Sequence, residues 1–205
     1  AEALFAEEGV KVDIRLVEHA DPAETILETA KNEGSNLVIM GNRGTGGAEN
    51  FLLGSVAEKV SRHVECPILI AKEKPTMANI LVAVDGSEYM EKILKRVVPL
   101  ATKRNAKVTL LNVVQTSVPW LKPEMSRAVG ERILSRAAAM VEGIEPDKRV
   151  EFGHPAQIIL EVAKGEGYDL IVMGRRGLGQ VKRFLLGSVS TRVSRHAHCS
   201  VLIVM

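Results

Sequence analysis

Residues 170–177 read LIVMGRRG, and nine residues later Gly187-Ser188 opens a stretch with the pattern of a helix. The apolar run at the start of this segment is typical of a buried strand. A glycine-rich turn between a strand and a helix is a candidate anion site. Glycine lets the backbone approach a phosphate closely, and the free N–H groups at a helix N-terminus attract negative charge.

The same glycine pattern occurs earlier in the chain, as GNRG over residues 41–44 and GS at residues 54–55. When residues 21–71 are displaced by 133 positions they align with residues 154–204 without a gap, and about half of the positions are identical. A period of this length is that of a domain rather than of a solenoid repeat. The sequence therefore predicts a tandem duplication.

Composition excludes several classes of function. The net charge of +2 is too small to predict binding to nucleic acid or to a membrane surface. No apolar run reaches the roughly 18 residues that span a bilayer, and the first residues lack the basic start of a secretion signal. The two cysteines, Cys66 and Cys199, occupy matching places in the repeat and do not form a disulfide framework. We expect a cytoplasmic protein.

Strands that alternate with helices predict βα units and a parallel sheet. The second unit, residues 79–205, has five predicted strands and four predicted helices. Its strands are expected over 79–84, 107–114, 149–152, 170–173 and 200–204, and its helices over 87–104 (capped by Ser87), 126–141, 155–165 and 187–196.

The first unit, residues 1–74, matches only the part of the second unit that follows about residue 134, so we expect the chain to belong to a longer protein. Its helices are expected over 1–9, 21–34 and 54–63, and its strands over 10–17, 37–40 and 67–71. A polar linker, residues 72–78, is expected between the units.

The glycine pattern of residues 174–188, repeated in residues 41–55, resembles the nucleotide-binding signature of the universal stress protein family. The resemblance covers essentially the whole chain, and residues 80–87 resemble the family's first strand with its acidic end. It implies an α/β fold: an open five-stranded parallel sheet flanked by helices, adenine nucleotide alpha hydrolase-like, with strand order 3-2-1-4-5. It also implies a tandem of two such units, the first N-terminally incomplete, with an adenine nucleotide at the carboxyl ends of the strands.

The resemblance also implies roles for individual residues. Asp85 would hold the ribose hydroxyls, and the backbone of Val113 would meet adenine. The remaining second-unit residues expected around base, ribose and phosphates are Ala83, Val84, Met173, Gly174, Gly177, Gly187, Ser188 and Val189. In the first unit only the phosphate part is matched, by Gly41, Gly44, Gly54, Ser55 and Val56.

The two glycine loops differ in charge. The second carries Arg175, Arg176, Lys182 and Arg183, whereas the first has Arg43 together with Glu49. This difference favours a polyphosphate at the second loop, with Arg176 as a phosphate contact; a solvated basic face is the alternative. The expected ligand is ATP, ADP or AMP, and Asp85 could join a magnesium ion that the polyphosphate brings with it.

Two other functions are alternatives to nucleotide binding in a stress response. No nucleophile–base pair is visible, so the chain is at most a slow ATPase or phosphotransfer enzyme. A non-catalytic scaffold with structural glycine loops is the other alternative. Residues 196–199, HAHC, contain zinc-ligand types, but Glu65 replaces His198 in the first copy, which favours a structural loop.

The last strands of the two units, residues 67–71 and 200–204, are apolar and expected at a sheet edge, where they would seek a partner. The resemblance implies that such strands pair across a dimer axis. We expect the units to form a pseudo-dimer within the chain, and a homodimer through the same edges.

Overall fold

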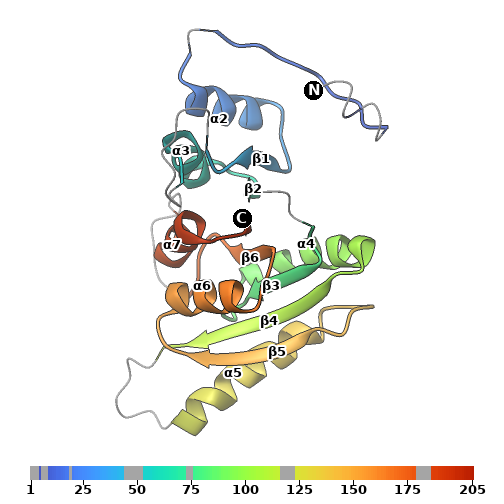
Figure 1. The fold of residues 1–205 in the computed structure, drawn as a ribbon, viewed down its shortest axis with the longest axis vertical. Helices are drawn as coiled ribbons and strands as arrows, with labels where there is room; N and C mark the ends of the chain where they lie inside the picture. Colours follow the sequence, from blue (N-terminus) through green and yellow to red (C-terminus); the bar gives the residue numbers. More distant parts are fainter. Residues whose placement is uncertain are drawn as a thin grey trace.

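The structure is a computed structural model that describes Phe5 and residues 9–18, 20–43, 53–72, 76–115, 123–178 and 186–205. The strands of this part of the chain form one seven-stranded sheet in the order β1-β2-β7-β6-β3-β4-β5, with helices on its faces (Figure 1). The prediction of an α/β fold with a mostly parallel sheet is confirmed.

In the second unit every predicted strand and helix is present, with small changes at the ends. The strands are β3 (Asn79–Ala83), β4 (Lys107–Val114), β5 (Asp147–Phe152), β6 (Leu170–Gly174) and β7 (Ser200–Val204). The helices are α4 (Tyr89–Arg104), α5 (Pro123–Ala138), α6 (Pro155–Gly165) and α7 (Ser188–His196).

The first unit contributes α2 (Pro22–Asn32), β1 (Val38–Gly41), α3 (Ser55–His63) and β2 (Ile68–Ala71). Helix α2 begins as its sequence predicts: the Asp21 side chain accepts a hydrogen bond from Glu24 N at 2.9 Å, and a proline occupies the first turn. The matching position before α6 is His154, whose side chain makes no capping bond.

The two units meet where β2 pairs with β7, which is the antiparallel step in an otherwise parallel sheet. Leu69 lies directly opposite Leu202, and these two leucines occupy equivalent positions in the 133-residue repeat. Each of these strands was expected at the edge of its own unit's sheet, where it would seek a partner; in the structure the two strands pair with each other, so each has a neighbour on both sides. The edges of the sheet are β1 and β5.

Two apolar cores lie on opposite faces of the sheet. On one face α4 and α5 cover alternate strand residues such as Ile80 and Val82. On the other, α6 and α7 pack together with α2 and α3 of the first unit over Leu81, Ile171 and the facing side of β2. A single core therefore runs across the junction between the units.

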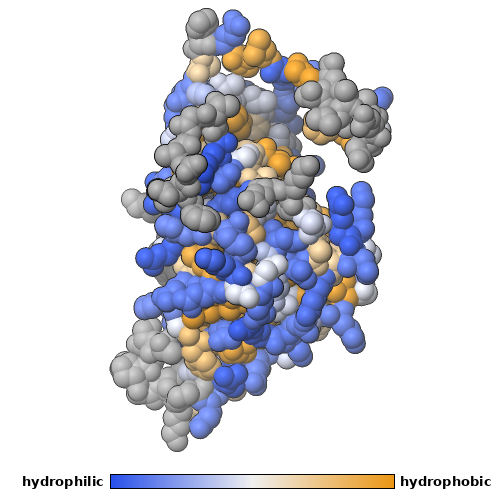
Figure 2. Space-filling view, in the orientation of Figure 1, coloured by the Kyte–Doolittle hydropathy of each residue, from blue (hydrophilic) through white to orange (hydrophobic). Residues whose placement is uncertain are grey.

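The predicted strand over residues 10–17 is absent, since these residues are extended but pair with no described strand. In the second unit β5 is held by its hydrogen bonds to β4, and the described residues of the first unit offer no equivalent of β4. An alternating pattern cannot form a strand without a partner. Apolar residues of this segment are consequently exposed (Figure 2). Leu16, for example, is 84% exposed.

Two other expectations need correction or fall outside the description. Helix α4 has Glu88 rather than Ser87 at its N-cap, because Ser87 lies in a turn in which its N–H donates to Asp85 Oδ1 at 3.0 Å. The predicted first helix lies largely outside the described residues, although Gly9, expected to stop it, has φ 67°.

Candidate functional site

A cavity of about 480 Å³ opens at the carboxyl ends of β3, β4 and β6. This is where the order of connections along the sheet reverses, since β3 has β4 on one side and β6 on the other. Every second-unit residue predicted for the site lines the cavity: Ala83, Val84, Asp85, Val113, Met173, Gly174, Arg176, Gly177, Gly187, Ser188 and Val189.

Part of the cavity lining is apolar. It is formed by Leu111 and Val113 of β4, by Val129 and Ile133 of α5, and by Ile159 of α6. Aliphatic walls of this kind exclude water and suit a flat, weakly polar group such as a nucleobase.

The buried Asn112 side chain fixes the strand ends behind this wall. Its Nδ2 donates to the carbonyl of Val84 at 2.8 Å, and Val84 N donates to Leu111 O at 2.9 Å. Helix α5 can approach Asn112 because it presents Gly130, where a Cβ would lie 2.8 Å from Asn112 Oδ1.

The polar part of the lining includes Asp85. Its Oδ1 accepts a hydrogen bond from Ser87 N at 3.0 Å, and its Oδ2 accepts one from Leu178 N at 3.1 Å. The carboxylate thus joins the end of β3 to the loop that follows β6.

Position 177 requires glycine because a side chain would have no room there, and not because of its backbone angles. A Cβ at this position would lie 2.4 Å from Asp85 Oδ2, while Gly177 is not among the described glycines with positive φ. Gly174 is similarly confined, because its Cβ would lie 3.0 Å from Tyr89 Cβ. Glycine at these positions keeps the backbone open to a ligand in the cavity.

The N-terminus of α7 forms the wall next to this loop. Gly187 is its N-cap, and Gly187 N donates to Arg175 O at 2.9 Å. Ser190 Oγ donates to Gly174 O at 2.8 Å, which ties the helix to the loop. No acidic residue lies in the first turn of α7, so its free N–H groups and positive dipole end can accept an anion.

The two loop arginines have different places. Arg176 lines the cavity. Arg175 is 8% exposed and reaches into the first unit, where Nη1 donates to Val64 O at 2.8 Å and Nη2 donates to Arg62 O at 2.5 Å. Arg175 belongs to the basic residues of the second loop but does not line the cavity, because the carbonyls at the end of α3 bind its guanidinium. Lys182 and Arg183 lie outside the described residues.

Several lining residues were not predicted from the sequence. They are Ile93, Leu111, Asn112, Val114, Gln115, Val129, Ile133, Pro155, Ile159, Leu178 and Ser190. The rule that ligands bind at the carboxyl ends of parallel strands could have found Asn112, Gln115 and Pro155. No sequence signal indicates that α5 faces the cavity.

The glycine loop of the first unit is closed by the same backbone hydrogen bond as the glycine loop of the second unit. Gly54 is the N-cap of α3, and Gly54 N donates to Asn42 O at 2.8 Å. Gly41, Gly54, Ser55 and Val56 do not line the cavity of the second unit. Among the described residues, a Cβ on Gly41 would meet only the backbone of Arg43 within 4 Å. Helix α3 carries Glu58 in its first turn, unlike α7. Gly44 lies outside the described residues.

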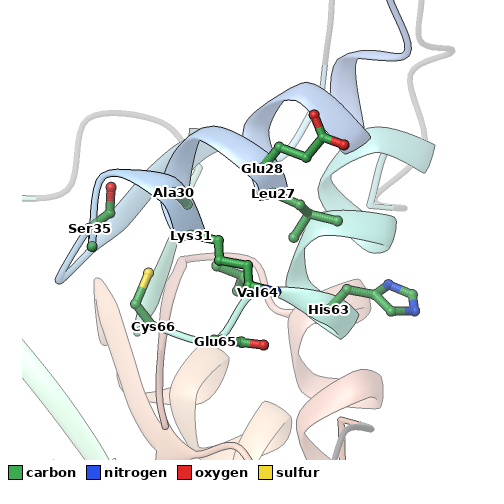
Figure 3. Close-up of a pocket in the computed structure, with 10 residues that line it drawn as sticks. Leu27, Glu28, Ala30, Lys31, Ser35, His63, Val64, Glu65 and Cys66 are labelled. Atoms are coloured by element: carbon green, nitrogen blue, oxygen red, sulfur yellow. The ribbon is translucent and has the colours of Figure 1, made fainter.

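A second hollow of about 310 Å³ lies between α2 and the end of α3 (Figure 3). It is lined by Leu27, Glu28, Ala30, Lys31, Gly34, Ser35, His63, Val64, Glu65 and Cys66. The second unit has Tyr168 where the first has Ser35. Tyr168 is buried and donates to Thr109 Oγ1 at 2.8 Å.

Within the described ranges, no group of three or more His, Cys, Asp or Glu side chains is arranged to hold a metal ion. Both cysteines are free, and burial raises the pKa of the Cys199 thiol to about 11. None of the helices described is long and apolar enough to cross a membrane.

The chain resembles universal stress proteins both in sequence and in structure. The model of the universal stress protein family matches residues 1–72 and 77–205. The chain belongs to the universal stress protein family. A universal stress protein of Staphylococcus haemolyticus is 37% identical over 140 residues, which are 63% of this chain and 85% of the relative.

Solved structures of universal stress proteins have the same fold. One from Archaeoglobus fulgidus is 26% identical with a TM-score of 0.74, and the match covers 97% of this chain and 73% of that one. A universal stress protein solved in complex with cAMP is 27% identical with a TM-score of 0.51 and covers 62% of this chain and 96% of that one. The family assignment made from the glycine signature is thereby confirmed.

Proposed function

We propose that this universal stress protein binds an adenine nucleotide, ATP, ADP or AMP, in the cavity of its second unit and acts in a cytoplasmic stress response. The observation that carries the proposal is the convergence of Asp85, Gly177 and the N-terminus of α7 on one cavity with a partly apolar lining. Its volume of about 480 Å³ lies within the range of small-ligand pockets. The cAMP complex of a relative supports this class of ligand.

The shape of the cavity suggests how the nucleotide would lie. Adenine would lie at the aliphatic part of the lining, against Ala83, Val84 and the backbone of Val113. Met173 and Gly174 would lie beside the ribose and base, at the end of β6. This orientation places the charged part of the ligand at the polar part of the lining, where the glycines and α7 lie.

The phosphates would meet the N-terminus of α7 at Gly187, Ser188 and Val189, with Gly177 and Arg176 beside them. Free N–H groups and one arginine stabilise negative charge there without a buried lysine. The Asp85 carboxylate would accept hydrogen bonds from the ribose hydroxyls. Because Oδ2 already accepts from Leu178 N, ribose binding would share or replace that bond.

We propose further that residues 1–74 and 79–205 are two units of one repeat that pair as a pseudo-dimer through β2 and β7. The opposed equivalent leucines, Leu69 and Leu202, support this arrangement. The pairing occupies the strand edges through which a homodimer was expected, so assembly of two chains through β7 would have to displace β2.

Isothermal titration with ATP, ADP and AMP tests the proposed function. We expect one nucleotide per chain and at least about a tenfold loss of affinity on Asp85→Ala, because two ribose hydrogen bonds to a charged group are lost. No heat with any of the three nucleotides would remove the proposal. Mass spectrometry of the purified protein for a copurified nucleotide is an independent measurement.

A matched pair of variants tests whether the second unit holds the complete site. Ser188→Glu and Ser55→Glu each place a carboxylate at the first position of equivalent helices, where it stabilises the helix itself. In α7 the added charge repels the phosphates, so we expect about a tenfold or larger loss of ATP affinity. Ser55→Glu is expected to bind as the wild type does, and equal losses in both variants would contradict a single complete site.

A further inference from the structure

Among the described residues, three polar contacts at the junction between the units break the symmetry of the repeat. Each contact uses a residue of one unit whose equivalent in the other unit is chemically different. The contacts are made by Lys72, Arg175 and Glu58. The residues at the equivalent positions of the other unit, 133 positions away in the sequence, are Met205, Asn42 and Thr191, respectively.

Lys72 follows β2 and reaches across the junction to the end of α7. Its Nζ donates to Ala197 O, the carbonyl at the C-cap of that helix. The side chain is almost buried, and burial lowers the pKa of Lys72. Backbone bonds accompany this contact: Lys72 N donates to Ser200 Oγ at 3.0 Å, and Ser200 Oγ donates to Lys72 O at 3.1 Å.

Arg175 makes the reciprocal contact from the second unit. Its guanidinium donates to Val64 O at 2.8 Å and to Arg62 O at 2.5 Å, at the end of α3. Val64 is the residue equivalent to Ala197. At the junction the C-terminus of α7 and the C-terminus of α3 therefore each bind one cationic side chain from the opposite unit. The two cations, Lys72 and Arg175, do not occupy equivalent positions of the repeat. Cations at helix C-termini stabilise the free carbonyls and the dipole.

Glu58 of α3 lies between two equivalent arginines. The same oxygen, Oε1, pairs with Arg62 Nη2 at 2.6 Å and with Nη2 of Arg195 in α7. Thr191 occupies the equivalent place in α7 and carries no charge. The carboxylate of Glu58 therefore forms ion pairs with one arginine of each unit.

We propose that the junction surface of the second unit, formed by β7, α7 and Arg175, is specific for the first unit and disfavours a second copy of itself. This inference goes beyond nucleotide binding and does not depend on it. Two second units paired through β7 would bring Arg195 against its own copy with threonines in place of Glu58, and like charges at such a contact repel. They would also place Met205 where Lys72 now lies.

Exchanging residues between equivalent positions of the full chain tests this specificity. Lys72→Met with Met205→Lys removes the cation from the end of α7 and brings a second one to the end of α3. Asn42→Arg with Arg175→Asn does the opposite. All four substitutions together return one cation to each helix end, with the two units' roles reversed.

We expect each two-residue exchange to lower the midpoint of thermal unfolding, measured without nucleotide, by about 4 °C or more, and the four-residue exchange to lie within about 2 °C of wild type. Recovery in the four-residue variant is the result that loss of packing alone would not produce. If that variant is as unstable as the two-residue variants, or if the latter match wild type, the proposal is overturned. Should the two-residue variants fail to fold, folding of the four-residue variant supports the proposal and its failure refutes it.

The carboxylate offers an independent exchange on the same surface. Glu58→Thr leaves Arg62 and Arg195 facing each other, and Thr191→Glu supplies a carboxylate from the other unit. We expect Glu58→Thr to lower the unfolding midpoint at low salt, and the addition of Thr191→Glu to restore it. Because exposed charges are screened, both differences should shrink in about 1 M NaCl; differences that persist in high salt would contradict the charge argument.

Discussion

Asp85 Oδ2 accepts a hydrogen bond from Leu178 N at 3.1 Å, and Gly177 is the residue over which the carboxylate lies. The end of β3 is thereby tied to the loop after β6 across the mouth of the cavity. The bond joins residues that are far apart in the chain, and it exists only because Gly177 has no side chain. The position of the Asp85 carboxylate therefore depends on the absence of a side chain at Gly177.

Gly177→Ala is expected to move the Asp85 carboxylate and to break its bond to Leu178, because the added methyl would lie 2.4 Å from Oδ2. ATP affinity should fall about tenfold or more, since a positioned charged acceptor is lost. Amide hydrogen exchange at Leu178 should become faster. Titration calorimetry and exchange mass spectrometry measure the two effects.

Gly165→Ala is the matched control for this variant. Gly165 ends α6, and a Cβ there would have nothing within 4 Å. The substitution should leave ATP affinity unchanged and leave stability equal or slightly raised, because alanine favours the helix. An affinity at Gly177→Ala equal to that of the control would contradict the coupling between Gly177 and Asp85.

Acidification should destabilise the fold in part through His198. Burial lowers the pKa of His198 from 6.5, aided by the charges of Lys164 and Lys72, while a hydrogen bond with the Tyr168 backbone opposes the shift. The unfolded chain then takes up the proton first, so stability is present above the unfolded pKa and is lost as the pH falls from about 6.5 through the folded pKa.

Thermal unfolding of wild type and His198→Gln between about pH 8 and about pH 5 measures this contribution. The wild-type midpoint should fall more steeply below about pH 6.5 than that of the variant, which cannot titrate at this position. Parallel curves would show that His198 does not contribute to the pH dependence.

The two cysteines should differ in reactivity. The pKa of Cys199 is raised to about 11 by burial, whereas Cys66 is half-buried and lines the hollow between α2 and α3 (Figure 3). Because the thiolate is the nucleophile, iodoacetamide at about pH 8 should modify Cys66 about tenfold or more faster than Cys199. Peptide mapping by mass spectrometry measures both rates, and in denaturant they should become equal. Equal rates in the native protein would contradict the prediction.

Tyr168 and Thr109 form a buried polar pair whose coupling can be measured. Tyr168→Phe leaves the Thr109 hydroxyl without its bond to Tyr168 and should cost about 1–3 kcal/mol of unfolding free energy. The double variant with Thr109→Val removes both partners, so its loss should be smaller than the sum of the single losses. Denaturant titration of the four proteins gives the coupling energy, and strict additivity would argue against the pair.

Most of the fold could be predicted because the sequence contains the same pattern twice. The strand over 107–114 and the helix over 155–165 have the predicted bounds, since apolar runs, Pro155 and flanking glycines indicate them directly. The segment 10–17 has an equally regular alternation and forms no strand. Periodicity reports which side chains could share a face, but a strand also needs hydrogen-bond partners elsewhere in the chain.

The candidate site was predictable to the extent that it lies on strand ends and glycine loops. Asp85 and Gly177 follow from the signature and lie together in the structure. Val129 and Ile133 of α5 could not be predicted, because packing across the sheet decides which helix closes the cavity. The place of the Arg175 side chain could not be predicted for a related reason, because the carbonyls that bind it belong to the other unit.

Arg175 connects the two halves of the molecule in a further way. Its neighbours Gly174 and Arg176 both line the cavity, while its own guanidinium is bound at the end of α3. We expect a ligand that orders the backbone of Gly174 and Arg176 to constrain the Arg175 guanidinium between them as well. Occupancy of the cavity and association of the two units would then be linked equilibria, each shifting the other by the same free energy.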